Sequence, residues 1–166
     1  LKGGDHFLQN FFIEKICNSL FIKEKINKNL LTSNEMAGKE IIESLLSSDL
    51  FSTKKLFILR DPQQIKGKPA KELLNYCSNP IPNHFLVLVN DNYMDKSSFT
   101  RSLTKIMDPI NVSTPFATDL YKWARFFFKE NEKKADSLVV EEIVENYGDS
   151  VFNVKNGIDK LCILID

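Results

Sequence analysis

Apolar residues follow two different patterns along the first two thirds of the chain. Some form continuous runs, as in strands covered on both faces, and others recur every three or four residues, as on one face of a helix. The predicted strands lie at residues 28–32, 56–59, 85–89 and 110–112, and residues 1–4 resemble a strand end and its turn. The predicted helices lie at residues 5–20, 32–46, 69–77 and 96–107. This alternation indicates a parallel sheet with helices on both faces.

Polar residues mark the predicted starts of two of these helices. Asp5 is expected to cap the first helix, and Thr32 and Glu35 have the spacing of a capping box for the second. The first helix is expected to bury one apolar stripe, whose members are Leu8, Phe12, Ile16 and Leu20.

The pattern changes after Pro115, where no further strand is indicated. Three helices are predicted instead, at residues 117–130, 136–147 and 150–164. Gly148 suits the end of the second of these and Asp149 the cap of the third. We therefore expect an α/β domain at 1–115 and a small all-helical lid domain at 116–166, a layout that resembles the RecA-like AAA+ module.

An AAA+ layout raises the question of ATP hydrolysis, which needs a Gly-x4-Gly-Lys-Ser/Thr loop to hold the phosphates and magnesium. The two Gly-Lys pairs, Gly38-Lys39 and Gly67-Lys68, lack both the preceding Gly and the following hydroxyl residue. Gly3-Gly4-Asp5 stands at the first strand–helix turn, where its carboxylate would repel phosphate. We therefore expect no nucleotide cofactor and no catalytic residue in this chain.

Composition and charge narrow the remaining possibilities. The chain has 22 basic and 22 acidic residues and no concentrated basic face, so direct DNA binding by this chain alone is not expected. No apolar run approaches the ~20 residues of a membrane span, so a cytoplasmic protein without membrane contact is expected.

Cysteine and histidine residues lie far apart in the sequence. Cys17, Cys77 and Cys162 lack metal-ligand spacing, and neither His6 nor His84 is near a cysteine cluster. Neither a metal site nor a nucleophilic triad is predicted.

The connection between the second helix and the strand at 56–59 contains an unexpected apolar pair. Leu50 and Phe51 stand side by side among Ser, Asp and Lys, where a short connection is normally polar. Such a pair can anchor in a partner's pocket. It can also fold back into its own core, and spacing alone favours this second interpretation.

The order of motifs resembles the delta subunit of bacterial DNA polymerase III, the clamp-opening subunit of the clamp loader. The run from Ser47 to Val89 has a small-Leu-Phe-small stretch, a basic residue, an apolar strand, a helix, a Pro-containing loop and a second apolar strand. The resemblance continues at Gly4–Leu8 and at Gly157–Leu161, where the family often has Glu in place of Gly157. It therefore covers the whole chain.

The resemblance implies a role for the apolar pair and a set of partners. Leu50 and Phe51 would insert into a hydrophobic pocket of the sliding clamp, the beta subunit. Gamma/tau and delta prime subunits would complete the loader, and DNA would be reached only through that complex. The family does not hydrolyse ATP, although it belongs to a nucleotidyltransferase holoenzyme. This chain would comprise its first two domains without the C-terminal collar domain.

Two other functions stay open from the residues. The first is a flavodoxin-like or receiver-like domain that binds a ligand or accepts a phosphoryl group. Gly3-Gly4-Asp5 and Arg60-Asp61-Pro62 fit a receiver poorly, and Asp61, Asp91 and Asp95 are more typical of turns than of a cleft. The second is a divergent AAA+ subunit that still binds ATP.

Overall fold

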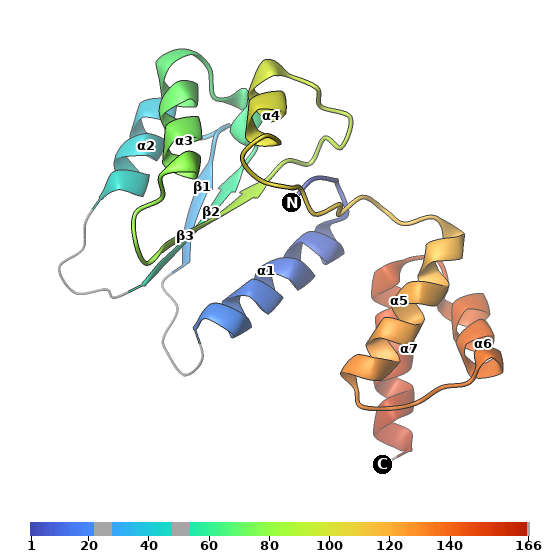
Figure 1. Cartoon of the computed structure of the whole chain (residues 1–166). Coiled ribbons are helices and arrows are strands. Elements are labelled where there is room, and N and C mark those ends of the chain that lie inside the picture. The colour runs from blue at the N-terminus through green and yellow to red at the C-terminus, as the bar shows by residue number, and fades with distance from the viewer. Residues whose placement is uncertain (22–27, 48–53, 166) are drawn as a thin grey trace. The chain divides into compact units, whose positions relative to one another are not determined.

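The computed structural model describes residues 1–21, 28–47 and 54–165 (Figure 1). The chain divides into two compact units, Leu1–Ser113 and Thr114–Asp166. The first combines strands and helices, and the second contains only helices in its described part.

The first unit is built on a parallel sheet of three strands in the order β1-β2-β3. The strands are β1 (Lys28–Thr32), β2 (Lys55–Arg60) and β3 (His84–Val89). Leu30 pairs with Ile58, which in turn pairs with Val87. The strands predicted at residues 28–32, 56–59 and 85–89 are thus confirmed, and the central one, β2, is the most buried.

The two ends of the first unit extend the sheet by single residue pairs. Lys2 bridges in parallel to Asn90, just after β3, and to Asn111. The backbone N–H of Lys2 donates to the carbonyl of Ile110 at 2.9 Å, and that of Val112 donates to the carbonyl of Lys2 at 2.9 Å. The predicted strand at 110–112 is therefore only an isolated bridge, because its partner segment contributes one paired residue.

Helix α1 (His6–Leu20) covers one face of the sheet (Figure 1). Asp5 caps it as predicted, accepting a hydrogen bond from the Leu8 N–H at 3.0 Å. The predicted apolar stripe is confirmed only in part: Leu8 is buried and Ile16 and Leu20 are partly buried against the sheet, but the fully buried residues beyond Leu8 are Gln9, Ile13 and Cys17. Apolar residues surround much of this helix, so their spacing alone did not identify the face that meets the sheet. The cluster on this face comprises Ile13, Cys17, Phe21, Leu56, Ile58, Val87 and Val89.

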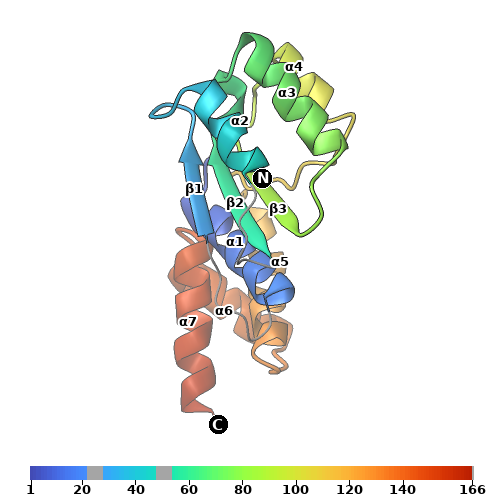
Figure 2. The ribbon, with the colours of Figure 1, turned by 90° about the vertical axis from the view of Figure 1, so that its left-hand side faces the viewer.

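The opposite face is covered by α2 (Gly38–Leu46), α3 (Gly67–Ser78) and α4 (Ser98–Leu103) (Figure 2). Phe57 and Leu59 of β2 face these helices, while Leu56 and Ile58 face α1, as the two-residue period of a strand requires. A short 3₁₀ turn, Pro62–Gln64, follows β2. The buried members of this larger cluster are Leu31, Ile41, Ile42, Leu45, Phe57, Leu59, Ile65, Leu73, Tyr76, Leu88 and Phe99. Helices on both faces of a parallel sheet confirm the expected α/β fold.

Two predicted helix starts in this unit are wrong. Helix α2 begins at Gly38, because the carboxylate of Glu40 accepts from the N–H of Ala37 at 3.1 Å and closes its first turn. Thr32 instead ends β1, and its carbonyl accepts the N–H of Glu35 in a turn. Helix α4 begins at Ser98, because Ser97 caps it and accepts the Thr100 N–H at 3.2 Å, and it ends at Leu103 instead of residue 107.

The second unit consists of α5 (Ala117–Glu130), α6 (Ser137–Tyr147) and α7 (Val151–Leu164), which confirms the three predicted helices. Helix α7 is capped by Ser150 rather than by Asp149, since the Ser150 hydroxyl accepts the Asn153 N–H at 3.1 Å. The buried side chains of the three helices form its core: Leu120, Ala124, Phe127, Phe128, Val140, Ile143, Val144, Val151, Val154, Ile158 and Cys162.

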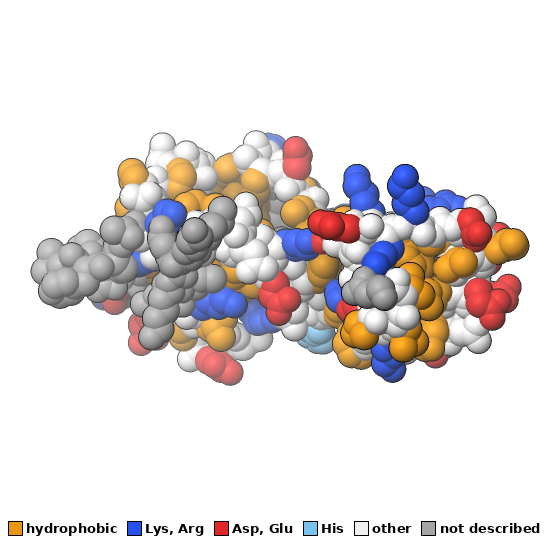
Figure 3. Space-filling model, turned by 90° about the horizontal axis from the view of Figure 1, so that it is seen from below, with side chains coloured by type: hydrophobic (Ala, Val, Ile, Leu, Met, Phe, Trp, Pro, Cys, Tyr) orange, Lys and Arg blue, Asp and Glu red, His pale blue; other side chains and the backbone are white. Residues whose placement is uncertain are grey.

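Apolar side chains are exposed at the end of α7. Ile163, Leu164 and Ile165 are all exposed there, and Figure 3 shows hydrophobic side chains gathered on the second unit around the end of the chain.

Candidate partner-binding site at the connection between α2 and β2

The apolar pair Leu50 and Phe51 lies outside the described residues, within the connection 48–53. The structure does describe both ends of this connection. Helix α2 leads into it through Leu46 and Ser47, and Lys54 leads out of it into β2. The site is therefore described by the residues on both sides of the connection, which we call the frame: Ser44, Ser47, Lys54 and Lys55.

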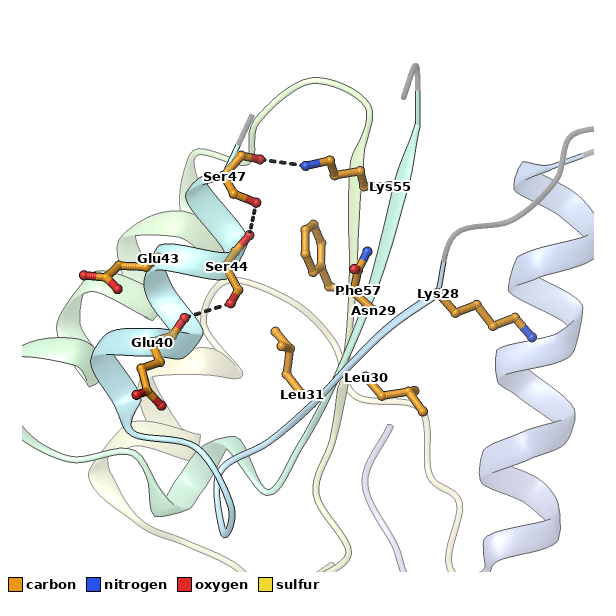
Figure 4. Close-up of a pocket in the computed structure, with 10 residues that line it drawn as sticks. All are labelled: Lys28, Asn29, Leu30, Leu31, Glu40, Glu43, Ser44, Ser47, Lys55 and Phe57. Atoms are coloured by element: carbon orange, nitrogen blue, oxygen red, sulfur yellow. Dashed lines mark hydrogen bonds between the residues drawn. The ribbon is translucent and has the colours of Figure 1, made fainter. Parts of the chain in front are cut away.

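A buried lysine ties the two ends of the connection together. The side chain of Lys55 is almost fully buried, and its Nζ donates to the carbonyl oxygen of Ser47 at 2.8 Å (Figure 4). The Ser47 hydroxyl donates in turn to the carbonyl of Ser44 at 2.8 Å. The hydroxyl of Ser44 donates to the carbonyl of Glu40 at 2.9 Å. The bond from Lys55 gives a partner to the carbonyl of Ser47, the residue that directly follows α2.

The strand side of the frame is held by two further hydrogen bonds. The Lys55 N–H donates to the carbonyl of Asn83 at 3.0 Å. The Nζ of Lys54 donates to the carbonyl of Leu20, at the end of α1, at 3.2 Å. The start of β2 is therefore fixed to α2, to the turn before β3 and to α1.

A hollow of about 640 Å³ lies beside this frame, between β1 and α2 (Figure 4). Phe57 and Leu31 extend toward α2 from the sheet, and Lys28 and Leu30 extend away from it. Glu43 at its edge pairs with the neighbouring Lys39 at 3.4 Å. The groups around the hollow do not form a constellation of acid, base and nucleophile, so it does not resemble an active site.

The second place to examine is the C-terminal end of the strands, where open parallel sheets usually bind ligands. A fully buried glutamine, Gln9 of α1, occupies the centre of this region. Its amide donates to the carbonyl of Gly3 and to Oδ1 of Asp91, both at 2.7 Å. Its Oε1 accepts from Nη1 of Arg60 at 3.0 Å. Protein groups thus satisfy one another at this edge.

Protein groups also occupy the turn before α1, where a phosphate group would bind. Asp5 places a carboxylate at the start of the helix and uses the N–H of Leu8. Gly3 lies against the neighbouring backbone with φ +135°, and a Cβ added there would come within 2.2 Å of the Ser113 nitrogen. A side chain at position 3 would therefore displace the segment that pairs with Lys2.

The aspartates at the strand ends have structural roles in turns. Asp61 adopts φ 54° and accepts hydrogen bonds from Asn34 and Gln63. Asp95 organises the turn before α4: burial raises the pKa of its carboxyl, but hydrogen bonds from Thr100, Ser97 and Asn90 outweigh this and lower it overall. These contacts support the interpretation of these residues as turn formers.

Groups that could carry other chemistry do not converge. Among the described residues, no cluster of three or more His, Cys, Asp and Glu side chains could hold a metal ion. Cys17 and Cys162 are buried, and burial raises the pKa of the Cys77 thiol to about 11. In the part of the chain that the structure describes, no helix is long and apolar enough to span a membrane.

Comparison with known proteins identifies the family. Residues 1–111 match the family model described as DNA polymerase III, delta subunit. The chain belongs to the DNA polymerase III delta subunit family. The match includes the whole sheet, the connection 48–53 and the Gln9 network.

The fold is also found in a solved structure. The chain is similar to the DNA clamp loader delta protein of Bacillus subtilis, with a TM-score of 0.83 and 17% sequence identity over 99% of this chain. It spans 52% of that protein's length. A DNA polymerase III gamma-subunit-related protein of Thermotoga maritima has 16% identity over 98% of this chain and 54% of its own, but its TM-score of 0.48 is too low to establish a shared fold. No curated protein matches the chain.

Sequence reasoning missed the residues that close the strand ends, Gln9 and Arg60. The available signal was Gln9 itself, a polar residue directly after Leu8 on a helix that must cover a sheet. The partners of Gln9, Gly3 and Asp91, are distant from one another in the sequence, so their contact depends on the tertiary fold.

Proposed function

We propose that this chain is the part of a clamp-loader subunit that binds and opens the replicative sliding clamp. Membership of the delta subunit family is the observation that carries this proposal. The similar solved protein from Bacillus subtilis is a DNA clamp loader delta protein. Leu50 and Phe51 are the proposed contact residues, and the pocket they enter belongs to the clamp.

The frame around the connection supports this assignment. Lys55 links the end of α2 to the start of β2, and Lys54 links β2 to α1. A partner bound at residues 48–53 would therefore act directly on the body of the first unit. Burying one leucine and one phenylalanine in a pocket contributes roughly 3–6 kcal/mol, which is enough for a dominant contact.

Clamp opening requires more than tight binding. A ligand shifts a conformational equilibrium only by its difference in affinity for the two states. The loader must therefore bind the opened or distorted ring better than the closed ring. A contact mounted on a fixed helix end suits this task, because the remaining surface of the unit can press on the clamp at a defined position.

ATP is assigned to other subunits of the complex in this proposal. The Gln9 network and the Asp5 cap occupy the edge of the sheet where a nucleotide would bind. The gamma/tau and delta prime subunits are the proposed partners that bring nucleotide and DNA into the assembly. Magnesium-dependent ATP titration of the chain alone should detect no binding, and micromolar affinity would contradict this assignment.

The decisive experiment is clamp binding by the Leu50→Ala/Phe51→Ala variant. We expect the affinity for the beta clamp, measured by surface plasmon resonance, to fall at least about a hundredfold, as at interface hot spots. The thermal unfolding midpoint should barely change. Unchanged affinity in the folded variant would refute the assignment, and so would a large loss of stability, which would place the pair in the chain's own core.

A matched control removes the same residue types elsewhere. Phe116 and Leu138 are 81% and 75% exposed and lie in the second unit. The Phe116→Ala/Leu138→Ala variant should bind the clamp as the parent chain does. An equal loss in both variants would show that general surface hydrophobicity, and not the 48–53 connection, drives binding.

A further inference from the structure

Helix α2 ends without the residue that most often terminates a helix. A glycine in the left-handed conformation is the common C-terminal cap, but no glycine occurs between Gly38 and Gly67. Ser47 instead leaves the helix in an extended conformation, with φ −64° and ψ 125°. The carbonyl groups at the C-terminal end of α2 therefore need donors from other parts of the chain.

Two side chains of the sheet supply such donors. The Nζ of Lys55 donates to the carbonyl of Ser47 at 2.8 Å (Figure 4), and Nδ1 of His84 lies 3.2 Å from the carbonyl oxygen of Leu45. Because a carbonyl oxygen only accepts, Nδ1 carries the hydrogen of the second bond. Lys55 and His84 are register partners across β2 and β3. The two donors therefore stand side by side at the same end of the sheet.

This end of the sheet face is polar, whereas the rest of the face is apolar on β2 and β3. The other side chains there pack into the larger cluster: Phe57, Leu59, Leu86 and Leu88. Lys55 is only 4% exposed, although lysine is rarely buried to this extent because desolvating an ammonium group is costly. An apolar residue would fill the same position without that cost. Holding the end of α2 is the task that distinguishes Lys55 and His84 from their apolar neighbours.

The bonds of Lys55 and His84 restrain the chain on both sides of the connection 48–53. Ser47 directly precedes this connection, and Lys55 lies two residues after it. One hydrogen bond therefore joins the two sides, and the bond from His84 holds α2 two residues before Ser47. A segment whose ends are fixed has fewer conformations to lose when it binds, which raises its affinity without any new contact.

We propose that Lys55 and His84 are positioning residues for the clamp contact. They set the point at which the chain leaves α2, and so restrict the conformations from which Leu50 and Phe51 bind. Neither residue has to touch the clamp. This inference rests on the proposed clamp-binding function and adds to it two residues that act through the apolar pair.

The first test is the Lys55→Met variant, which keeps a long unbranched side chain and removes the donor. In the folded variant, the affinity for the beta clamp in surface plasmon resonance should fall about tenfold, since roughly one further residue must then be ordered on binding. Lys2→Met is the matched control, because the Nζ of Lys2 donates to the carbonyl of Asp95 at 2.9 Å near the opposite end of β3. An unchanged affinity in Lys55→Met, or an equal loss in the control, would overturn the proposal.

A double-mutant cycle separates positioning from other effects of Lys55 on binding. In the Leu50→Ala/Phe51→Ala background, Lys55→Met should cause no further loss of affinity, because no apolar pair is left to position. An equal loss in both backgrounds would overturn the proposal, since Lys55 would then act independently of the pair.

His84 allows a third measurement with a conservative rescue. His84→Phe keeps an aromatic ring without a donor and should weaken clamp binding severalfold. His84→Asn places an amide donor close to the position of Nδ1 and should retain most of the affinity. Equal affinities of these two variants would overturn the assignment of His84. The same comparison decides the proposal if Lys55→Met does not fold.

The outcomes separate this proposal from the one on which it rests. If Leu50→Ala/Phe51→Ala weakens clamp binding while Lys55→Met and His84→Phe do not, only the positioning proposal fails. If Leu50→Ala/Phe51→Ala has no effect, or the parent chain does not bind the clamp, both proposals fail.

Discussion

Replacing Gln9 by leucine tests whether a buried hydrogen-bond network closes the ends of the strands. Gln9 is 0% exposed and joins α1 to Gly3, Arg60 and Asp91. Leucine has a similar size, so the substitution removes the hydrogen bonds without opening a large cavity. The expected result is a less stable first unit.

The expected loss of stability depends on which partners of Gln9 can be hydrated once its side-chain amide is removed. The side chains of Arg60 and Asp91 are 34% and 44% exposed, so both can be rehydrated. The carbonyl of Gly3 is buried and would lose its bond from the Gln9 amide. Leaving one buried acceptor unsatisfied costs about 1–3 kcal/mol. This is a large part of the 5–15 kcal/mol that typically stabilises a domain.

Hydrogen exchange measured by mass spectrometry provides the assay. Peptides that cover β2 and β3 report the opening of the first unit alone, and their exchange should accelerate by about tenfold or more, since 1.4 kcal/mol is a factor of ten. Asn10→Leu is the matched control, because Asn10 is exposed on the same helix. If Gln9→Leu costs less than about 0.5 kcal/mol, or no more than the control, the network does not stabilise this edge.

Three further predictions concern single positions. Gly157→Ala should destabilise the second unit by about 1–2 kcal/mol in urea unfolding followed by Trp123 fluorescence, because a Cβ would lie 2.7 Å from Cδ2 of Tyr147. In a Tyr147→Ala background the same substitution should stabilise the unit, and an effect of the same sign in both backgrounds would contradict the predicted clash. Since the folded state lowers the pKa of Asp95, the ionised carboxylate contributes to stability above the unfolded pKa of 3.8, and this contribution is lost as pH falls through the folded pKa. The free energies of unfolding of the parent chain and the Asp95→Asn variant should therefore differ at pH 7 and converge in acid, and a difference that does not change with pH would contradict this coupling. With its pKa raised to about 11, the Cys77 thiol should be alkylated at pH 8 by an electrophile that attacks thiolates about a hundredfold more slowly than a free cysteine, as quantified by mass spectrometry. An equal rate of alkylation would show that the thiol is not shielded.

Local patterns in the sequence determined the elements and their class. Continuous apolar runs identified β2 and β3, because a strand covered on both faces needs an apolar side chain at every position. Asp5 and Gly148 marked a helix start and a helix end, because caps act within one turn of the backbone. The order of motifs along the chain also indicated the delta subunit family, since that order is a property of the sequence alone.

Tertiary packing decided which surfaces meet. The buried face of α1 centres on Ile13 and Cys17, and the predicted Ile16 lies only partly buried beside them, because several faces of this helix are apolar and only contact with the sheet selects one. The segment around Asn111 forms a bridge and not a strand, because its pairing depends on Lys2 at the other end of the unit.

The candidate sites follow the same division. Leu50 and Phe51 were found from the sequence as an apolar pair in a polar connection, and their contact with a clamp stays a prediction. The frame that joins Ser47 to Lys55 was not visible in the sequence. Periodicity encodes the geometry of one element, whereas the role of a buried ammonium group depends on which distant elements pack around it.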